Sequence, residues 1–154
     1  MTGAREAGVT AAAAIQLGDV TRDGDRFHAS MMFPGLPEHV RTARRFADRV
    51  LGHGHPCEEL ARLLTSELVT NSVMHSRSRG PEGTVGVTVS GTPDSVLVEV
   101  ADAGAGTVPQ VRAGEDPDDE GGRGLRLVAE MADEWGCRQN GAGCVTWFSV
   151  KAGS

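Results

Sequence analysis

Two segments in which valine alternates with other residues constrain the fold more than any other part of the sequence. They span residues 84–90 and 95–101, and residues 91–94, which read Gly-Thr-Pro-Asp, separate them. Alternation of this kind predicts strands with one apolar face, and the connection between them predicts a hairpin. That face needs a covering layer, because a sheet that is apolar on one side must bury it. The alternating residues are Val85, Val87, Val89, Val96, Val98 and Val100.

The rest of the chain supplies helices for such a layer and further strands. Apolar residues recur at helical spacing in three segments, and three short segments have the character of strands. The order is strand, two helices, two strands, helix, two strands. It indicates an α+β two-layer sandwich, with a mixed, mainly antiparallel sheet and the helices on one face. The helical segments are residues 38–51, about 58–76 and 124–135, and the strand segments are residues 26–33, 135–139 and 144–150.

The domain organisation follows from length and periodicity. Residues 1–25 are rich in Ala, Gly, Thr and Asp and show no sustained periodicity, which predicts a flexible N-terminal tail. Residues 26–154 have the length of one ordinary domain. Within this domain, residues 80–83 and 102–124 are expected to be loops because of their glycine and acidic residues.

Charge and composition argue against several classes of function. A net charge of -6 is unsuited to a surface that binds duplex nucleic acid. Two Trp, four Phe and no Tyr leave few rings on which single-stranded bases could stack. The sequence has no run of 18 apolar residues and no secretory signal pattern, so we expect no membrane span and a cytoplasmic location.

The cysteines and histidines give no clear metal or disulfide pattern. Cys57, Cys137 and Cys144 show no paired spacing, and their odd number suits reduced thiols. His53, His55 and Cys57 provide three potential zinc ligands, but no fourth ligand lies nearby in the sequence. A structural zinc site is therefore not expected.

The helix at about residues 58–76 carries a carboxylate and an amide within its apolar stripe. Glu67 and Asn71 lie four residues apart and so share one face of this helix. Such groups need partners, because an unpaired buried charge is strongly unfavourable. One interpretation is that they cap a neighbouring loop or contact a buried water. The other is that they line a ligand site, where Glu67 polarises a nucleophile and the amide oxygen of Asn71 is a hard ligand for Mg²⁺.

Two glycine-containing segments follow. Asp102 ends a predicted strand and continues into Ala-Gly-Ala-Gly, where glycines permit a tight turn and the close approach of a ligand. Residues 121–125, Gly-Gly-Arg-Gly-Leu, open a predicted helix whose free N–H groups suit phosphate. This segment is not a Walker A loop, and no strand immediately precedes it as a dinucleotide fingerprint requires. An ordinary strand exit and a flexible hinge remain the alternatives for the two segments.

Taken in order, the three segments resemble the N box and the two glycine boxes of the gyrase, heat-shock ATPase, histidine kinase and mismatch-repair (GHKL) ATPases. They read Glu-Leu-Val-Thr-Asn at 67–71, Asp-Ala-Gly-Ala-Gly at 102–106 and Gly-Arg-Gly-Leu at 122–125. The chain is most similar to the small stand-alone bacterial branch related to anti-sigma-factor serine kinases, over about residues 27–150. The resemblance implies a Bergerat-type ATP-binding fold, with ATP and Mg²⁺ as cofactors.

The resemblance also implies a role for each matching position. Asp102 would accept a hydrogen bond from the exocyclic amine of adenine, Asn71 would hold Mg²⁺, and Glu67 would be the catalytic base in phosphoryl transfer. Backbone amides in the second glycine box would cradle the phosphates, and the first box would shape the pocket beneath a lid at about residues 107–120. The further nucleotide-binding positions are Gly104, Gly106, Gly122, Arg123, Gly124 and Leu125.

One position departs from the pattern of the family. Relatives often have Thr two residues before the terminal Trp, where it supports the adenine contact. Here Val145 occupies that position, two residues before Trp147, and Thr146 follows it. Either the register of the strand differs or a water molecule takes the place of the hydroxyl.

The implied function is that of an ATP-dependent protein serine/threonine kinase. It would sequester a regulator such as a sigma factor and phosphorylate an antagonist protein. The alternative is a non-catalytic switch whose ATP state sets its affinity for a partner. Glu67 favours the enzyme, because a pure binding protein needs no base there. The resemblance leads us to expect a homodimer and protein partners, without direct contact to nucleic acid or membrane.

Overall fold

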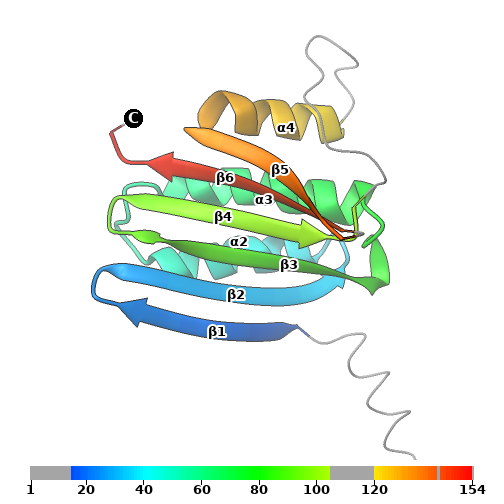
Figure 1. Cartoon of the computed structure of the whole chain (residues 1–154), viewed down its shortest axis with the longest axis horizontal. Coiled ribbons are helices and arrows are strands. Elements are labelled where there is room, and N and C mark those ends of the chain that lie inside the picture. Colours follow the sequence, from blue (N-terminus) through cyan, green and yellow to red (C-terminus); the bar gives the residue numbers. More distant parts are fainter. Residues whose placement is uncertain (1–14, 105–119, 142, 154) are drawn as a thin grey trace, which may run out of the picture.

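The computed structural model describes residues 15–104, 120–141 and 143–153. Within these residues, six strands form one sheet in the order β1-β2-β3-β4-β6-β5, and all neighbouring strands are antiparallel (Figure 1). The valine hairpin therefore lies at the centre of the sheet as β3 and β4. The strands are β1 (Gln16–Asp23), β2 (Arg26–Gly35), β3 (Gly80–Thr92), β4 (Ser95–Asp102), β5 (Glu134–Asn140) and β6 (Gly143–Lys151).

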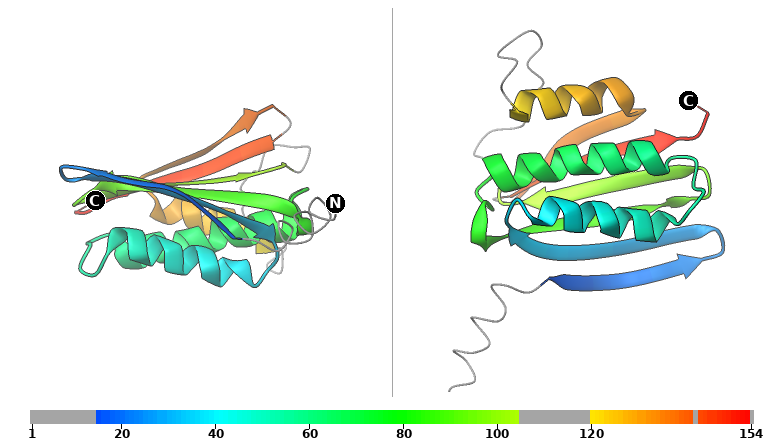
Figure 2. Two further views of the ribbon diagram at one scale, coloured as in Figure 1. Left: turned by 90° about the horizontal axis from the view of Figure 1, so that it is seen from below. Right: turned by 180° about the vertical axis from the view of Figure 1, so that it is seen from behind.

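Helices cover one face of this sheet (Figure 2). In the described part of the chain they are α2 (His39–Leu51), α3 (Glu58–His75) and α4 (Glu120–Met131). Helix α3 lies between the other two and contacts both. The predicted α+β two-layer sandwich with helices on one face is confirmed. None of the helices in these residues has the length and apolar character needed to span a bilayer.

The hydrophobic core lies between the sheet and the helices. All six alternating valines are buried, as the period of two predicts. The antiparallel register continues this apolar face across the sheet, since Val98 pairs with Phe148 of β6 and Val87 pairs with Met31 of β2. Leu64 and Leu68 of α3 are buried against it. Among the described residues, no helix lies over the opposite face of the sheet (Figure 2).

The prediction of a tail over residues 1–25 was wrong for residues 16–23, which form the edge strand β1. Backbone pairing with β2 holds this strand, and Arg22 donates a hydrogen bond to the Val50 carbonyl of α2 at 3.1 Å. Leu17 and Val20 are 64% and 55% exposed. Because β1 has few buried side chains, the hydrophobic pattern contains little sign of it. Residues 1–14 lie outside the described residues.

Two predicted loop boundaries were also wrong. Residues 80–83 belong to β3, and Gly80 pairs with Gly35 of β2. Helix α4 begins at Glu120, so the glycine segment 121–124 lies inside its first turns and not in a preceding loop. Residues 80–83 thus belong to a strand and residues 121–124 to a helix, although the composition of both stretches is typical of loops.

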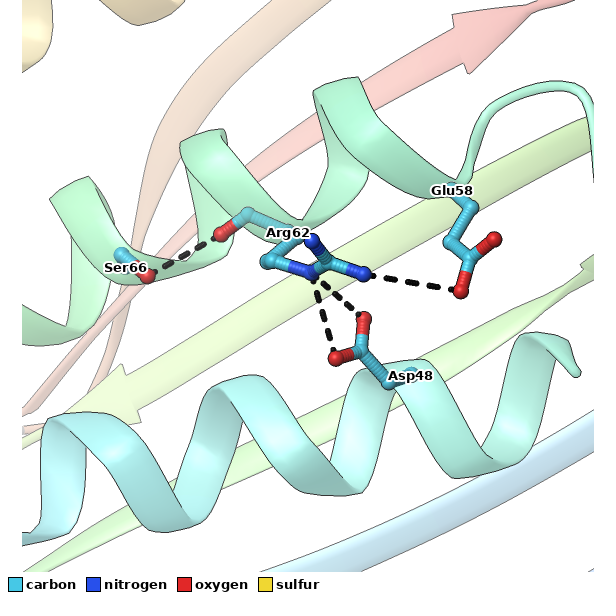
Figure 3. A network of polar contacts seen from close by, with 4 residues as sticks. All are labelled: Asp48, Glu58, Arg62 and Ser66. Carbon is cyan, nitrogen blue, oxygen red and sulfur yellow. Dashed lines mark hydrogen bonds and ion pairs between the residues drawn. The ribbon is translucent and has the colours of Figure 1, made fainter. Parts of the chain in front are cut away.

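A small network of ion pairs connects α2 to α3 (Figure 3). Arg62 Nε lies 3.0 Å from Asp48 Oδ1 and 3.2 Å from Asp48 Oδ2, and Arg62 Nη2 lies 3.6 Å from Glu58 Oε2. Ser66 Oγ donates to the Arg62 carbonyl at 3.0 Å. The Arg62 side chain is 42% exposed, so these pairs orient the two helices and contribute little to stability.

The loop before α3 is held by His55 and Cys57. His55 Nδ1 accepts the Cys57 N–H at 3.0 Å, so Nε2 carries the ring proton and donates to the Thr92 carbonyl at 2.8 Å. The buried Cys57 thiol lies 3.8 Å from the carbonyl oxygens of Asp94 and Val150. These contacts join the loop to the β3–β4 turn and to β6. The described residues contain no cluster of three His, Cys, Asp or Glu side chains suited to a metal ion.

Cys137 and Cys144 form a disulfide, so the expectation of reduced thiols was wrong for this pair. Their Cα atoms are 6.8 Å apart. The register of β5 and β6 explains the bond, because Cys137 pairs with Thr146, two residues from Cys144 on the same face. The hairpin between the strands thus brings together two cysteines whose spacing in the sequence shows no recognisable motif.

Candidate functional site

The three segments that carry the predicted site residues meet at one end of the molecule. The end of β4, the second half of α3 and the start of α4 lie there together (Figure 1). Helix α3 contacts both β4 and α4. The fold therefore places Asp102 beside the last turn of α3 and Gly124 beside Glu67, although these residues are far apart in the sequence.

Asp102 is the last residue of β4, and its carboxylate contacts α3. Ser72 Oγ donates to Asp102 Oδ2 at 2.5 Å, and the backbone N–H of Gly104 donates to Asp102 Oδ1 at 2.7 Å. Each carboxylate oxygen can accept two hydrogen bonds, so each keeps one acceptor position. The side chain is only partly buried. The carboxylate is thus held at both oxygens and can still accept from a ligand.

The turn after Asp102 is fixed to the end of α3 through its backbone. The N–H of Ala103 donates to Ser78 Oγ at 2.9 Å, and the N–H of Arg77 donates to the Gly104 carbonyl at 2.7 Å. Gly104 has a φ of 76°, in the left-handed region that glycine adopts without strain. Glycine at this position of the first glycine box is therefore required by the backbone.

Glu67 and Asn71 lie four residues apart on α3 and are both partly buried. Neither side chain has a hydrogen-bond partner within residues 15–104, 120–141 and 143–153. Gly124 of α4 packs directly against the first of them, because a Cβ atom on residue 124 would lie 3.0 Å from Glu67 Oε2. The Glu67 carboxylate therefore lies against the beginning of α4.

The other predicted site residues are placed as follows. Leu125 is 4% exposed and belongs to the core, so its side chain anchors α4. Gly122 and Arg123 lie in α4, but their surroundings are outside what the structure describes. Gly106 and residues 107–119 of the predicted lid also lie outside it.

The register of β6 decides which of Val145 and Thr146 faces the site. Thr146 pairs with Val100, and Cys144 pairs with Asp102, whereas Val145 pairs with the exposed Ala101. Paired residues share a face, so Thr146 lies on the helix-covered face that also carries Asp102. Its side chain is buried. Thr146, and not Val145, therefore lies on the side of the site.

Three residues of this region are not singled out by the sequence motifs. Ser72 and Ser78 are buried and bind Asp102 and the turn after it. Gly143 lies against β4, where an added Cβ would be 2.6 Å from the Asp102 carbonyl oxygen. The sequence does contain a sign of Ser72, because this polar residue lies on the same helix face as Leu64 and Leu68, at spacings of four. The other two depend on contacts between distant segments.

This set of groups fits a purine nucleotide with a hard cation. Asp102 is an acceptor for an amine, and the Asn71 amide oxygen belongs to the class of ligands that Mg²⁺ prefers. The first turn of α4 has N–H groups without helical partners at the positive end of the helix dipole, which suits phosphate. Glu67 lies beside that turn, with its carboxylate against Gly124.

Comparison with known families agrees with this chemistry. The family model described as the histidine kinase-like ATPase domain matches residues 33–150, which is most of the chain and includes all three segments of the site. A comparison with curated proteins found no match. The chain therefore belongs to the family of histidine kinase-like ATPase domains, the GHKL-type ATPases, and is an ATP-binding protein.

Proposed function

We propose that this chain is an ATP-dependent protein serine/threonine kinase of the anti-sigma-factor type. It sequesters a regulatory protein, such as a sigma factor, and phosphorylates an antagonist protein. The observation that supports catalysis is the position of Glu67, whose carboxylate lies against Gly124 at the beginning of α4. A protein that only binds ATP needs no base beside the place where the phosphates bind.

Each residue of the site has a part in this proposal. Asp102 accepts a hydrogen bond from the 6-amino group of adenine, and the free backbone amides of the first turn of α4, among them that of Gly122, bind phosphate oxygens. The amide oxygen of Asn71 is the protein ligand of Mg²⁺. When bound, this ion neutralises charge on the phosphates. Thr146 lies on the same face of the sheet as Asp102 and supports the adenine end of the site.

Glu67 acts on the incoming serine or threonine of the antagonist. Its carboxylate accepts the hydroxyl proton as the oxygen attacks the transferred phosphoryl group, and it orients that hydroxyl beforehand. General-base assistance of this kind is typically worth about 10²–10⁴-fold in rate. Ground-state binding of ATP depends much less on Glu67, because the role of the carboxylate is toward the nucleophile.

The test uses partners that the immobilised chain captures in the presence of Mg-ATP. Transfer of labelled γ-phosphate to the captured antagonist is then measured for the wild type, Glu67→Gln and Asn71→Ala. Glu67→Gln should keep near-normal affinity for Mg-ATP and lose about 10²–10⁴-fold in transfer. Asn71→Ala should lose both the Mg²⁺ dependence and the activity.

Glu59→Gln is the matched control, because Glu59 is an exposed carboxylate in the first turn of the same helix. This variant should transfer phosphate as the wild type does. If the wild type binds ATP and its partner but labels nothing, the kinase proposal fails, and the chain is a non-catalytic ATP-dependent switch. Undiminished transfer by Glu67→Gln would refute the role of the base.

A further inference from the structure

We propose that Ser72 is a positioning residue for adenine recognition. Its hydroxyl holds the Asp102 carboxylate in the orientation that accepts the 6-amino group, and so it contributes to the preference for adenine. This inference rests on the proposed contact between Asp102 and adenine. The observation behind it is the hydrogen bond from Ser72 Oγ to Asp102 Oδ2, which joins the last turn of α3 to the end of β4.

The carboxylate needs such a second contact. The terminal torsion of an aspartate side chain has broad minima, so its orientation is not determined by rotamer preference. The Gly104 N–H binds only Oδ1. With Ser72 bound to Oδ2, a donor occupies each oxygen, and the plane of the carboxylate is set. Ser72 is 4% exposed, so water does not readily compete for its hydroxyl.

The backbone around Asp102 is held without the Ser72 hydroxyl. Ser76 Oγ donates to the Ser72 carbonyl at 2.7 Å and accepts the N–H of Ser78 at 2.9 Å. The Ser78 hydroxyl in turn accepts the N–H of Ala103. These contacts use the main chain of Ser72 and not its side chain. Removing the hydroxyl should therefore free the Asp102 carboxylate while the connection between α3 and β4 remains.

Because the hydroxyl of Ser72 and its main chain make different contacts, a positioning role of the hydroxyl can be distinguished from a structural one. If the Ser72 hydroxyl serves only the fold, its loss weakens the binding of every nucleotide alike. If the hydroxyl orients Asp102, its loss weakens the binding of only those nucleotides that donate a hydrogen bond to the Asp102 carboxylate. ATP has the 6-amino group, whereas purine riboside triphosphate lacks it and is otherwise the same. The ratio of their dissociation constants is therefore the quantity that reports the orientation of Asp102.

The experiment measures both nucleotides by calorimetry with Mg²⁺ for the wild type, Ser72→Ala and Ser66→Ala. Ser66 is the matched control, because its hydroxyl binds the Arg62 carbonyl one turn earlier on the same helix. For Ser72→Ala we expect the Kd for ATP to rise about fivefold, with less than about a twofold change for purine riboside triphosphate. Ser66→Ala should match the wild type for both nucleotides.

Two results for Ser72→Ala would overturn the inference: unchanged affinity for ATP, or an equal loss for both nucleotides. If urea unfolding shows that Ser72→Ala does not fold, Ser72→Thr decides, since it retains the hydroxyl. A preserved ATP preference in that variant supports the inference, and a lost preference overturns it. Failure of the wild type to prefer ATP over the analogue overturns the adenine contact of Asp102 itself, and this outcome is visible before any variant is compared.

Discussion

Replacing Gly124 with alanine should leave the stability of the chain almost unchanged and still reduce phosphoryl transfer. Two opposing terms produce this result. Alanine is favoured over glycine within a helix by about 1 kcal/mol. The added Cβ, however, would lie 3.0 Å from Glu67 Oε2, closer than an ordinary van der Waals contact. The Glu67 carboxylate must then shift by a few tenths of an ångström, and a side chain pushed off its rotamer loses about 0.5–1.5 kcal/mol.

A double-mutant cycle with Glu67→Ala separates these terms. In that background the carboxylate is absent, and Gly124→Ala should gain the full ~1 kcal/mol in urea unfolding. With Glu67 present, the gain should fall to nearly zero. Phosphate transfer to the captured antagonist should decrease, because the displaced carboxylate no longer faces the nucleophile. Gly86→Ala is the control for transfer, since an added Cβ there has its nearest neighbours 3.8 Å away.

Equal stabilisation by Gly124→Ala in both backgrounds would refute the reasoning, because the Glu67 carboxylate would then not lie against α4. Full phosphate transfer by Gly124→Ala in the presence of Glu67 would show that the position of the carboxylate does not matter for the reaction.

Three further predictions concern the base contact, a buried thiol and the disulfide. Asp102→Ala should weaken ATP binding by about 1.5–3 kcal/mol, or roughly 10–100-fold; calorimetry with ATP and GTP measures this, and an unchanged affinity for ATP would contradict the assignment. Burial, with smaller effects from nearby carboxylates, raises the pKa of the Cys57 thiol. The folded state thus retains the proton longer than the unfolded state. Stability should be full below roughly pH 8.5 and decline above it, and urea unfolding should show a shallower decline for Cys57→Ala. Reduction of the Cys137–Cys144 bond should lower the free energy of unfolding by about 2 kcal/mol, an effect that a Cys137→Ser, Cys144→Ser double variant should not show.

Much of the fold and of the candidate site was predictable from local patterns. Strand and helix periods depend on the backbone geometry of one element, so the alternating valines of β3 and β4 and the apolar stripe of α3 appear in the sequence itself. The same holds for Glu67 and Asn71, whose spacing of four places them on one helix face. The second glycine box could be assigned to a helix start for the same local reason, although α4 begins earlier, at Glu120.

The edge strand β1 and the disulfide were not predictable in this way. The strand at Gln16–Asp23 forms through backbone hydrogen bonds to β2, which any side chain permits, and it buries few apolar residues that could create a pattern. The disulfide depends on the register of β5 against β6, which is a property of two strands together. No single segment of the sequence therefore contains a pattern that predicts the strand or the disulfide.

The sequence by itself determined the helices and the strands β2 to β6, which face of each is apolar and which polar side chains interrupt those faces, because these properties are local. Only the tertiary structure decided which distant groups touch. It placed Ser72 against Asp102, Gly124 against Glu67 and Thr146 on the face of the site. The physical reason is that contacts between segments depend on strand order, register and helix packing, and many remote residues set these jointly.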